Sequence, residues 1–260
     1  MKLSAHHASQ FVKLLYIGDS GTGKTGSLTS LVAAGYHLKI LDLDNGLDTL
    51  AGFVRRECPD KIDNVDSETI RDKYRTSPGG VVVSGQPKAF TKSLELMTKW
   101  PDGTTPADWG PQTVFVLDSL TALSKAAFEW AEGLNPNAKE PRTWYFVAQK
   151  SIENTIALLT SEAFHCNVIV ISHIDWRETP EGLTKGYANS IGKALGPTLP
   201  RYFNSLILAE KSGSGANVAR TIKTLPTSQI DLKTPVPFKL DKPLPLGTGL
   251  ATVFEKLKET

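Results

Sequence analysis

The sequence predicts an α/β fold in which a mostly parallel central sheet is covered by helices on both faces. Apolar runs typical of buried strands, such as Thr113–Leu117 and Asn167–Ser172, alternate with segments of helical period, such as Ser119–Trp130 and Glu140–Ser161. Strands that alternate with helices indicate a parallel sheet. The 260 residues, 40% hydrophobic and 22% charged, are enough for one large domain with its own core.

The N-terminal part predicts a strand–helix–strand unit with a right-handed crossover. Phe11–Ile17 is a short apolar run, Lys24–Ala34 has apolar residues at helical spacing, and His37–Leu43 is a second apolar run. The other expected elements are helices over Thr49–Arg56 and Pro87–Trp100, a strand over Val81–Val83, and a C-terminal β-hairpin of Ser205–Leu208 and Val218–Lys223 turning at Ser212–Gly215.

Two segments lack a clear period. Residues 175–198 are rich in glycine, proline and mixed charges, which predicts a long mobile loop of the kind that is usually functional. Residues 226–260 form a Pro-rich extension that we expect to be loosely packed. We therefore expect a single domain over residues 1–260, with its core at about 11–225.

Composition narrows the location and the class of site. No run approaches the roughly 20 apolar residues of a membrane span, and the N-terminus lacks the apolar centre of a signal peptide. We expect a cytoplasmic protein, in the host cell if it is viral, with no membrane partner. Cys58 and Cys166 lack the neighbours of a zinc site or a disulfide framework. With a net charge of +2, any nucleic-acid binding must come from local basic surface.

The strongest local signal is a phosphate-binding loop for ATP. Residues 18–25 match GxxxxGK[ST] in full, between an expected strand and an expected helix. Backbone amides of such a loop surround phosphates at the positive end of a helix dipole. We expect Lys24 to reach the β- and γ-phosphates and Thr25 to ligate Mg²⁺. The nucleotide-binding set is Gly18, Asp19, Ser20, Gly21, Thr22, Gly23, Lys24, Thr25 and Gly26. The alternative is a glycine-rich turn that matches by accident.

Three further residues follow apolar strands and are candidates for catalysis. Asp118 ends the run Thr113–Leu117, at the strand end where ligands bind in open α/β sheets, and is the expected second Mg²⁺ residue. Residue 119 is serine and supplies no second acid, so the residue that orients the attacking water must lie elsewhere. Asp44 is placed for that role, because it shares a face with Asp42 at the end of the second strand. His173 is placed to sense the γ-phosphate. The alternatives are a helix cap for Asp118, a turn for Asp44 and a structural role for His173.

These features resemble the RecA-type core, and more closely phage-type RecA-like ATPases implicated in single-strand annealing and recombination. The resemblance lies in residues 40–48, 114–123 and 168–174, in their order, and in the lead-in at residues 107–110. It covers about residues 11–225. It implies a RecA-like P-loop NTPase core and an ATPase that uses ATP and Mg²⁺ and is stimulated by DNA.

The resemblance also implies roles for particular residues. The water-activating acid falls on Asp44, where the family usually has glutamate, and the sensor falls on His173, where glutamine is common. A basic residue of the later hairpin enters a neighbour's ATP site in the family, and Lys223 is the nearest match, with Arg220 second. The loop after His173 binds single-stranded DNA in RecA-like proteins, and its candidate contacts are Trp176, Arg177, Lys185, Tyr187 and Lys193. That loop has an alternative reading as a solvated segment of mixed charge.

The sequence thus favours an ATP-hydrolysing protein that binds single-stranded DNA and promotes annealing or recombination as a homo-oligomer, either a ring or a filament. The alternative is an ATP-switched assembly or DNA-packaging factor that acts on a protein partner through the same loop, since P-loop cores host many functions. A small-molecule kinase is a third reading, disfavoured because no arginine-rich lid is evident.

Overall fold

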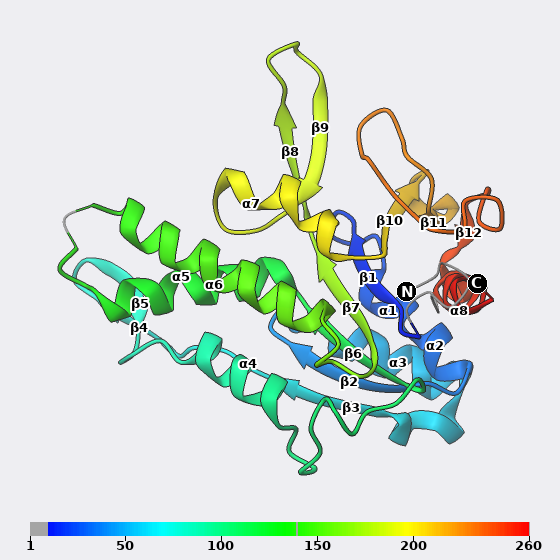
Figure 1. Ribbon diagram of the computed structural model, residues 1–260, viewed down its shortest axis with the longest axis horizontal. Coiled ribbons are helices and arrows are strands. Elements are labelled where there is room, and N and C mark those ends of the chain that lie inside the picture. The colour runs from blue at the N-terminus through cyan, green and yellow to red at the C-terminus, as the bar shows by residue number, and fades with distance from the viewer. Residues whose placement is uncertain (1–9, 139, 260) are drawn as a thin grey trace, which may run out of the picture.

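The computed structural model describes residues 10–138 and 140–259, and its centre is an eight-stranded sheet (Figure 1). The strand order is β12-β11-β10-β1-β7-β6-β2-β3. The strands are β1 Lys13–Ile17, β2 His37–Asp42, β3 Val65–Thr69, β6 Thr113–Asp118, β7 Asn167–Ser172, β10 Ser205–Ser212, β11 Ala219–Lys223 and β12 Leu244–Pro245. Neighbours from β10 to β3 pair in parallel, whereas β10–β11 and β11–β12 are antiparallel. The predicted fold class is confirmed, including the hairpin of β10 and β11.

Helices cover both faces of this sheet. They are α1 Lys24–Ser27, α2 Thr29–Ala33, α3 Leu47–Glu57, α4 Ala89–Thr98, α5 Leu120–Leu134, α6 Arg142–Thr160, α7 Gly192–Thr198 and α8 Leu246–Lys258. Leu14 and Tyr16 of β1 join the core beneath α1–α3 and α8, while Leu15 and Ile17 join the core beneath α4–α6. This alternation is the period of two expected for a strand buried on both faces. Short 3₁₀ helices occupy Pro59–Asn64, Leu199–Tyr202 and Gly215–Asn217.

The prediction of a long mobile loop at residues 175–198 is wrong. The chain there forms strands β8 (Ile174–Glu178) and β9 (Thr184–Ala188), paired as an antiparallel hairpin, and then α7. The hairpin projects away from the sheet in Figure 1. Its glycines serve packing and turning: a Cβ on Gly186 would lie 2.9 Å from side-chain atoms of Ile174 and Trp176, and Gly182 turns the chain at φ +77°.

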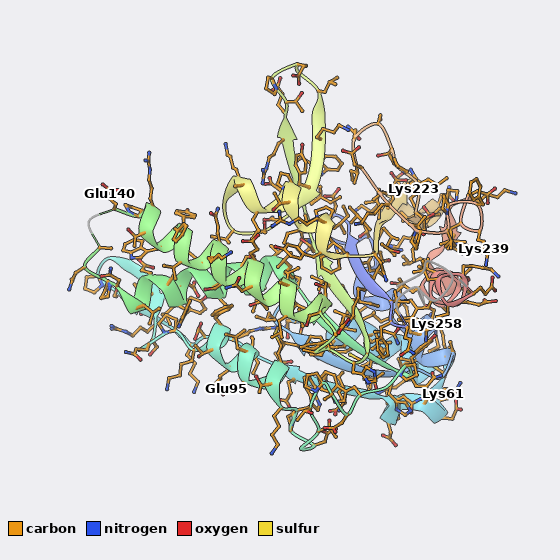
Figure 2. All side chains as sticks on the ribbon, viewed as in Figure 1. Lys61, Glu95, Glu140, Lys223, Lys239 and Lys258 are labelled. Carbon is orange, nitrogen blue, oxygen red and sulfur yellow. The ribbon has the colours of Figure 1, made fainter. Side chains whose placement is uncertain are left out.

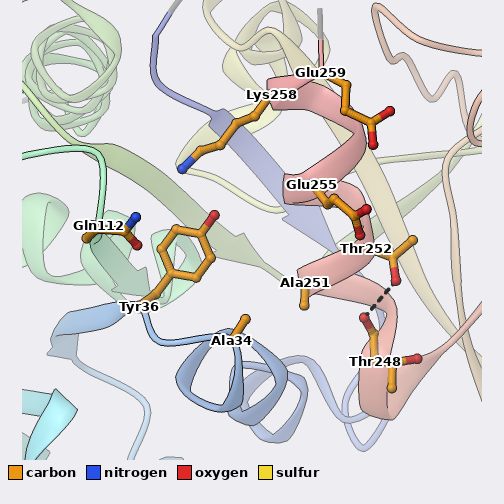
Figure 3. Close-up of a pocket in the computed structure, with 9 residues that line it drawn as sticks. All are labelled: Ala34, Tyr36, Gln112, Thr248, Ala251, Thr252, Glu255, Lys258 and Glu259. Atoms are coloured by element: carbon orange, nitrogen blue, oxygen red, sulfur yellow. Dashed lines mark hydrogen bonds between the residues drawn. The ribbon is translucent and has the colours of Figure 1, made fainter.

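The prediction of a loosely packed C-terminal tail is also wrong. Its last part is α8, which packs along α2 and β11 and buries Leu250, Val253 and Phe254 completely. The Phe254 ring meets Tyr36 edge-on with centroids 5.5 Å apart. The outer side of α8 and Tyr36 line a surface pocket of about 530 Å³, where Thr252 donates a hydrogen bond to the carbonyl of Thr248 (Figure 3).

Smaller departures concern the first helix and the segment before α4. The predicted helix Lys24–Ala34 is divided into α1 and α2, with helical backbone angles continuing through Leu28. The predicted strand Val81–Val83 is present as β5 (Gly80–Val83), but it pairs with β4 (Tyr74–Ser77) in a separate two-stranded sheet. The residues whose composition argues against a signal peptide, 1–9, lie outside the described part. Among the helices of the described part, none has the length and apolar character to cross a bilayer.

The packing of α8 predicts a large contrast between two phenylalanines of the C-terminal segment. Phe254 is 0% exposed and Phe238 is 96% exposed. We expect Phe254→Ala to lower the free energy of unfolding by about 3–5 kcal/mol through lost burial and a residual cavity. Phe238→Ala should stay within about 0.5 kcal/mol of the parent. Urea unfolding followed by circular dichroism measures both, and equal stabilities of the two variants would contradict the packing described for α8.

Candidate nucleotide site

Polar residues from four parallel strands meet at one edge of the sheet. The register pairs Asp42 with Asp118, Asp118 with Ile171, and Ile17 with Ser172, so the carboxyl ends of β2, β6, β7 and β1 lie in one row. Carboxyl ends of strands are where open α/β sheets bind ligands. The phosphate-loop motif follows β1 at this row, and its residues 20, 21 and 23–26 line a cleft of about 650 Å³ together with Asp44, Asp118 and His173.

The loop after β1 has the conformation of a phosphate cradle. Gly21 and Gly23 adopt φ of 73° and 90°, which residues with a Cβ rarely adopt, and the chain then enters α1 directly. The amide of Ser27 donates to the carbonyl of Gly23 at 2.9 Å, so the helix starts within the motif. Successive amides at a helix start form an anion-binding concavity.

The Lys24 side chain is buried and folds back onto this loop. Its ammonium donates to the carbonyls of Gly18 at 2.7 Å and Asp19 at 3.0 Å. Burial lowers the pKa of Lys24, and the nearby carboxylates of Asp118, Asp19 and Asp44 offset part of that effect. The lysine therefore lies within the cradle and is held by groups that a phosphate could replace.

Thr25 and Asp118 form the contact expected of two magnesium residues. The Thr25 hydroxyl donates to Oδ2 of Asp118 at 2.7 Å, and both residues line the cleft. A hydroxyl and a carboxylate are hard oxygen donors of the kind Mg²⁺ prefers, with phosphate and water completing the octahedron. Among the described residues there is no cluster of three or more His, Cys, Asp or Glu that could hold a metal ion by itself. The donors therefore fit a Mg²⁺ that arrives with a nucleotide.

The pKa of Asp118 is raised to about 6, chiefly by burial and in smaller part by the neighbouring Asp44 and Asp42, while the Thr25 hydrogen bond and the charge of Lys24 oppose the rise. This carboxylate is destabilised without a cation, which favours cation binding.

Asp44 and His173 lie together at the same cleft. Nε2 of His173 is 3.5 Å from Oδ2 of Asp44. Burial opposes ionisation of Asp44, but hydrogen bonds from His173 and Ser119, with the charges of His173 and Lys24, bring its pKa below the usual value. Asp42 has a different task, because its Oδ1 accepts the amides of residues 44, 45 and 46. Strand β2 ends at Asp42, so a capped turn, and not an extended strand, presents Asp44 to the cleft.

The later hairpin and the C-terminal helix contribute residues that the sequence did not assign to this cleft. Arg220 of β11 donates from Nε to the carbonyl of Gly21 at 3.2 Å within the same chain. Lys223, labelled in Figure 2, is the first choice for a basic residue entering a neighbour's site, and it pairs with Glu210 at 2.6 Å. Phe53 of α3 and Leu246 of α8 also line the cleft, and no local sequence signal indicated them.

Four of the five residues predicted to contact DNA lie on the β8–β9 hairpin, on both of its faces, and the fifth, Lys193, lies in α7. The register pairs Asp175 with Tyr187 and Arg177 with Lys185, so these four side chains share one face. The guanidinium of Arg177 lies 5.3 Å from the Tyr187 ring and also donates to the carbonyl of Lys193 in α7. Trp176 lies on the other face, where its indole donates to Asp19 of the phosphate loop at 3.2 Å.

A comparison with protein families identifies the kind of domain that contains this cleft. A family model described as an AAA domain matches residues 10–236, which is most of the chain. The chain belongs to the AAA domain family. This AAA domain is a nucleotide-binding domain of the P-loop ATPase type, as the sequence predicted at that level. Curated protein sequences give no match.

Two solved structures are similar to this AAA domain in outline. The flagellar accessory protein FlaH from Methanocaldococcus jannaschii is 11% identical, with a TM-score of 0.40 and coverage of 85% of this chain and 79% of that chain. A KaiC-like protein from the archaeon Pyrococcus horikoshii is 14% identical, with a TM-score of 0.38 and coverage of 82% and 77%.

The environment of Asp118 predicts that its charge lowers the stability of the nucleotide-free AAA domain. Its pKa is about 6 in the fold against an ordinary value of 3.8, so the fold binds this proton more tightly than the unfolded chain does. Ionising the group at pH 7.5 then costs up to about 3 kcal/mol, and this cost fades as the pH falls through 6 toward 4. We expect Asp118→Asn to unfold at a higher temperature than the parent at pH 7.5, with a smaller difference at pH 5.

The same variant should respond less to ligand. Mg²⁺-ATP should raise the unfolding temperature of the parent by binding the folded state, and should raise that of Asp118→Asn much less. Differential scanning fluorimetry across pH, with and without Mg²⁺-ATP, measures both effects. A variant that is less stable than the parent at pH 7.5 without ligand would contradict the proposed cost of ionising Asp118 in the fold.

Proposed function

We propose that this protein is a Mg²⁺-dependent ATP hydrolase. The observation that carries the proposal is the 2.7 Å contact between Thr25 and Asp118 beside the buried ammonium of Lys24, at the mouth of a glycine-rich cradle. These are the hydroxyl, the strand-end acid and the lysine that phosphoryl transfer requires. The hydroxyl and the lysine come from the phosphate-loop motif after β1 and the acid from the end of β6, at the same edge of the sheet.

The residues of the cleft then have separate tasks. Lys24 exchanges the carbonyls of Gly18 and Asp19 for phosphate oxygens and keeps its charge in the cradle. Thr25 and Asp118 would hold Mg²⁺, which, when bound, neutralises charge that develops on the phosphates. Asp44, kept ionised by His173 and its other neighbours, accepts a hydrogen bond from the attacking water and orients it. His173 lies beside the Asp44 carboxylate, where a bound γ-phosphate would change the surroundings of its imidazole.

Removing the lysine tests this assignment. We expect Lys24→Ala to lower ATP turnover by about 100- to 1,000-fold, because one preorganised charge on the transferring phosphoryl group is lost. Lys239→Ala is a matched control, since Lys239 is an exposed lysine that pairs with Glu259 at the far end of α8. A coupled phosphate-release assay measures both, and unchanged hydrolysis in Lys24→Ala would refute the site.

We further propose that single-stranded DNA binds the hairpin face that carries Arg177, Lys185 and Tyr187, with Lys193 beside it. What supports this is the grouping of cations and an aromatic ring on one face, a combination suited to phosphates and unstacked bases. Trp176 is 41% exposed but bonds to Asp19, so its part is a link between this hairpin and the ATP site. ATP hydrolysis would then be stimulated by DNA.

Carboxylates on and near this face set the expected strength of DNA binding. Arg177 pairs with Asp175 at 2.6 Å, and Lys185 pairs with Asp231 at 3.2 Å. Phosphates must displace these partners, so binding should be weak and strongly weakened by salt.

Two substitutions at one ion pair should therefore change DNA affinity in opposite directions. Lys185→Gln should weaken binding of a labelled oligo-dT and reduce the slope of log K against log salt by about 1. Asp231→Asn should strengthen it by roughly two- to fivefold, because it frees Lys185 from a surface ion pair worth ~0.2–1 kcal/mol. Fluorescence anisotropy at several salt concentrations measures both, and parallel changes in the two variants would argue against a DNA-binding face.

For the biological task we propose annealing or recombination by a homo-oligomer, a ring or a filament, as the RecA-like resemblance implies. Within one chain, Lys223 is neutralised by Glu210 and Arg220 contacts the chain's own phosphate loop, so a subunit interface would have to rearrange this hairpin to supply either residue to a neighbour. Electron micrographs with an ATP analogue and single-stranded DNA test the assembly, and isolated monomers under those conditions would oppose it.

One observation favours the alternative, an ATP-switched assembly or DNA-packaging factor with a protein partner. Leu183, next to the hairpin turn, is 62% exposed, which suits a protein contact better than a phosphate contact. The same anisotropy titration separates the two functions: an AAA domain that hydrolyses ATP but binds no DNA at low salt would favour the protein partner.

A further inference from the structure

The nucleotide cleft is lined by two apolar side chains that have no part in binding phosphate. Among the residues that line the cleft, Phe53 and Leu246 are the two large apolar side chains. They lie against different glycines at the start of α1: a Cβ on Gly26 would be 2.7 Å from Cε2 of Phe53, and a Cβ on Gly23 would be 2.5 Å from Cδ2 of Leu246. Both side chains therefore border the cradle directly.

Phe53 is held in position by its helix and by a neighbouring arginine. It belongs to α3, whose buried residues Leu50 and Val54 fix the helix against the sheet. The guanidinium of Arg56 lies over the Phe53 ring at 4.9 Å from its centroid. The ring is half-buried, so part of its surface is left for a ligand in the cleft.

Leu246 is held as firmly, by the C-terminal segment. Strand β12 pairs with β11 through Leu244 and Pro245, and α8 begins at the next residue. The completely buried residues Leu250 and Phe254 then anchor α8, and the amide of Ala251 donates to the Ser30 hydroxyl of α2 at 3.3 Å. In Figure 1, α8 lies beside α2 and β12. Leu246 lies beyond the AAA domain match, which ends at residue 236.

We propose that Phe53 and Leu246 together bind the heterocyclic base of the nucleotide, so that the C-terminal helix completes the site. This rests on the proposed ATP hydrolase function and adds the residues that recognise the base. In this arrangement, backbone amides and Lys24 hold the phosphates. A purine base has flat apolar faces, and stacking them on an aromatic ring and packing them on a leucine is favourable. These two side chains supply that apolar surface at the edge of the phosphate cradle.

Comparing two ligands that differ by the nucleoside tests the proposal. Mg²⁺-ATPγS contains the base, whereas Mg²⁺ with inorganic tripolyphosphate offers only the phosphates. We expect Phe53→Ala and Leu246→Ala each to weaken ATPγS binding by roughly tenfold, about 1.4 kcal/mol, and to leave tripolyphosphate binding within about twofold of the parent. Phe238→Ala, which removes an exposed ring from the same C-terminal segment, should change neither. Isothermal titration calorimetry measures all of these.

The outcomes separate this proposal from the proposed function. Unchanged ATPγS affinity in both alanine variants would overturn it, and so would equal loss of both ligands in variants that melt like the parent. If an alanine variant does not fold, Phe53→Leu keeps an apolar side chain against Gly26 and removes only the ring; it should still lose ATPγS selectively, and full retention would overturn the stacking role of Phe53. A parent protein that binds neither ligand would instead refute nucleotide binding at the phosphate loop.

Discussion

The parallel register of the central strands is the constraint on which the site depends. Because β2, β6, β7 and β1 pair in parallel, with Asp42 opposite Asp118 and Ile17 opposite Ser172, their carboxyl ends cannot separate without breaking a ladder buried on both faces. The phosphate loop, the Asp118 carboxylate and His173 each follow one of these strands. The hydrogen bonds of the sheet thus fix where the strand ends that carry these groups lie relative to one another.

The charged groups of the cleft have partners within the same chain. Lys24 bonds to two carbonyls of its loop, Thr25 bonds to Asp118, and Asp44 has His173 beside it. Each of these contacts uses a group that a Mg²⁺-nucleotide would engage, so binding exchanges one set of partners for another instead of creating charged groups in an unprepared site. The raised pKa of Asp118 indicates that these partners only partly offset the cost of burying its charge.

The sequence could predict those parts of the structure whose cause is local. A strand, a glycine-rich turn and a helix start within residues 11–27, so the phosphate loop could be recognised, and Asp118 was evident from the apolar run before it. The β8–β9 hairpin was missed because its glycines resemble those of a loop, although Gly186 is there to make room for Ile174 and Trp176. Helix α8 was missed because its position depends on buried contacts with β11 and α2, which are far away in sequence. The ion pair between Lys223 and Glu210 was likewise not evident from the sequence, because it depends on the pairing of β10 with β11.

The hairpin that was expected to be a mobile loop is joined to the ATP site at two points, and this matters for how the proposed activities could be related. It starts directly after His173, which faces Asp44, and Trp176 on β8 holds the carboxylate of Asp19 within the phosphate loop. Since Lys24 bonds to the carbonyl of the same Asp19, a lysine that turns toward phosphate loosens one of the bonds that fix Asp19. The indole contact would then carry that change to β8, whose other face holds Arg177 of the proposed DNA contacts. A paired hairpin transmits such a displacement over its length, whereas a mobile loop would absorb it.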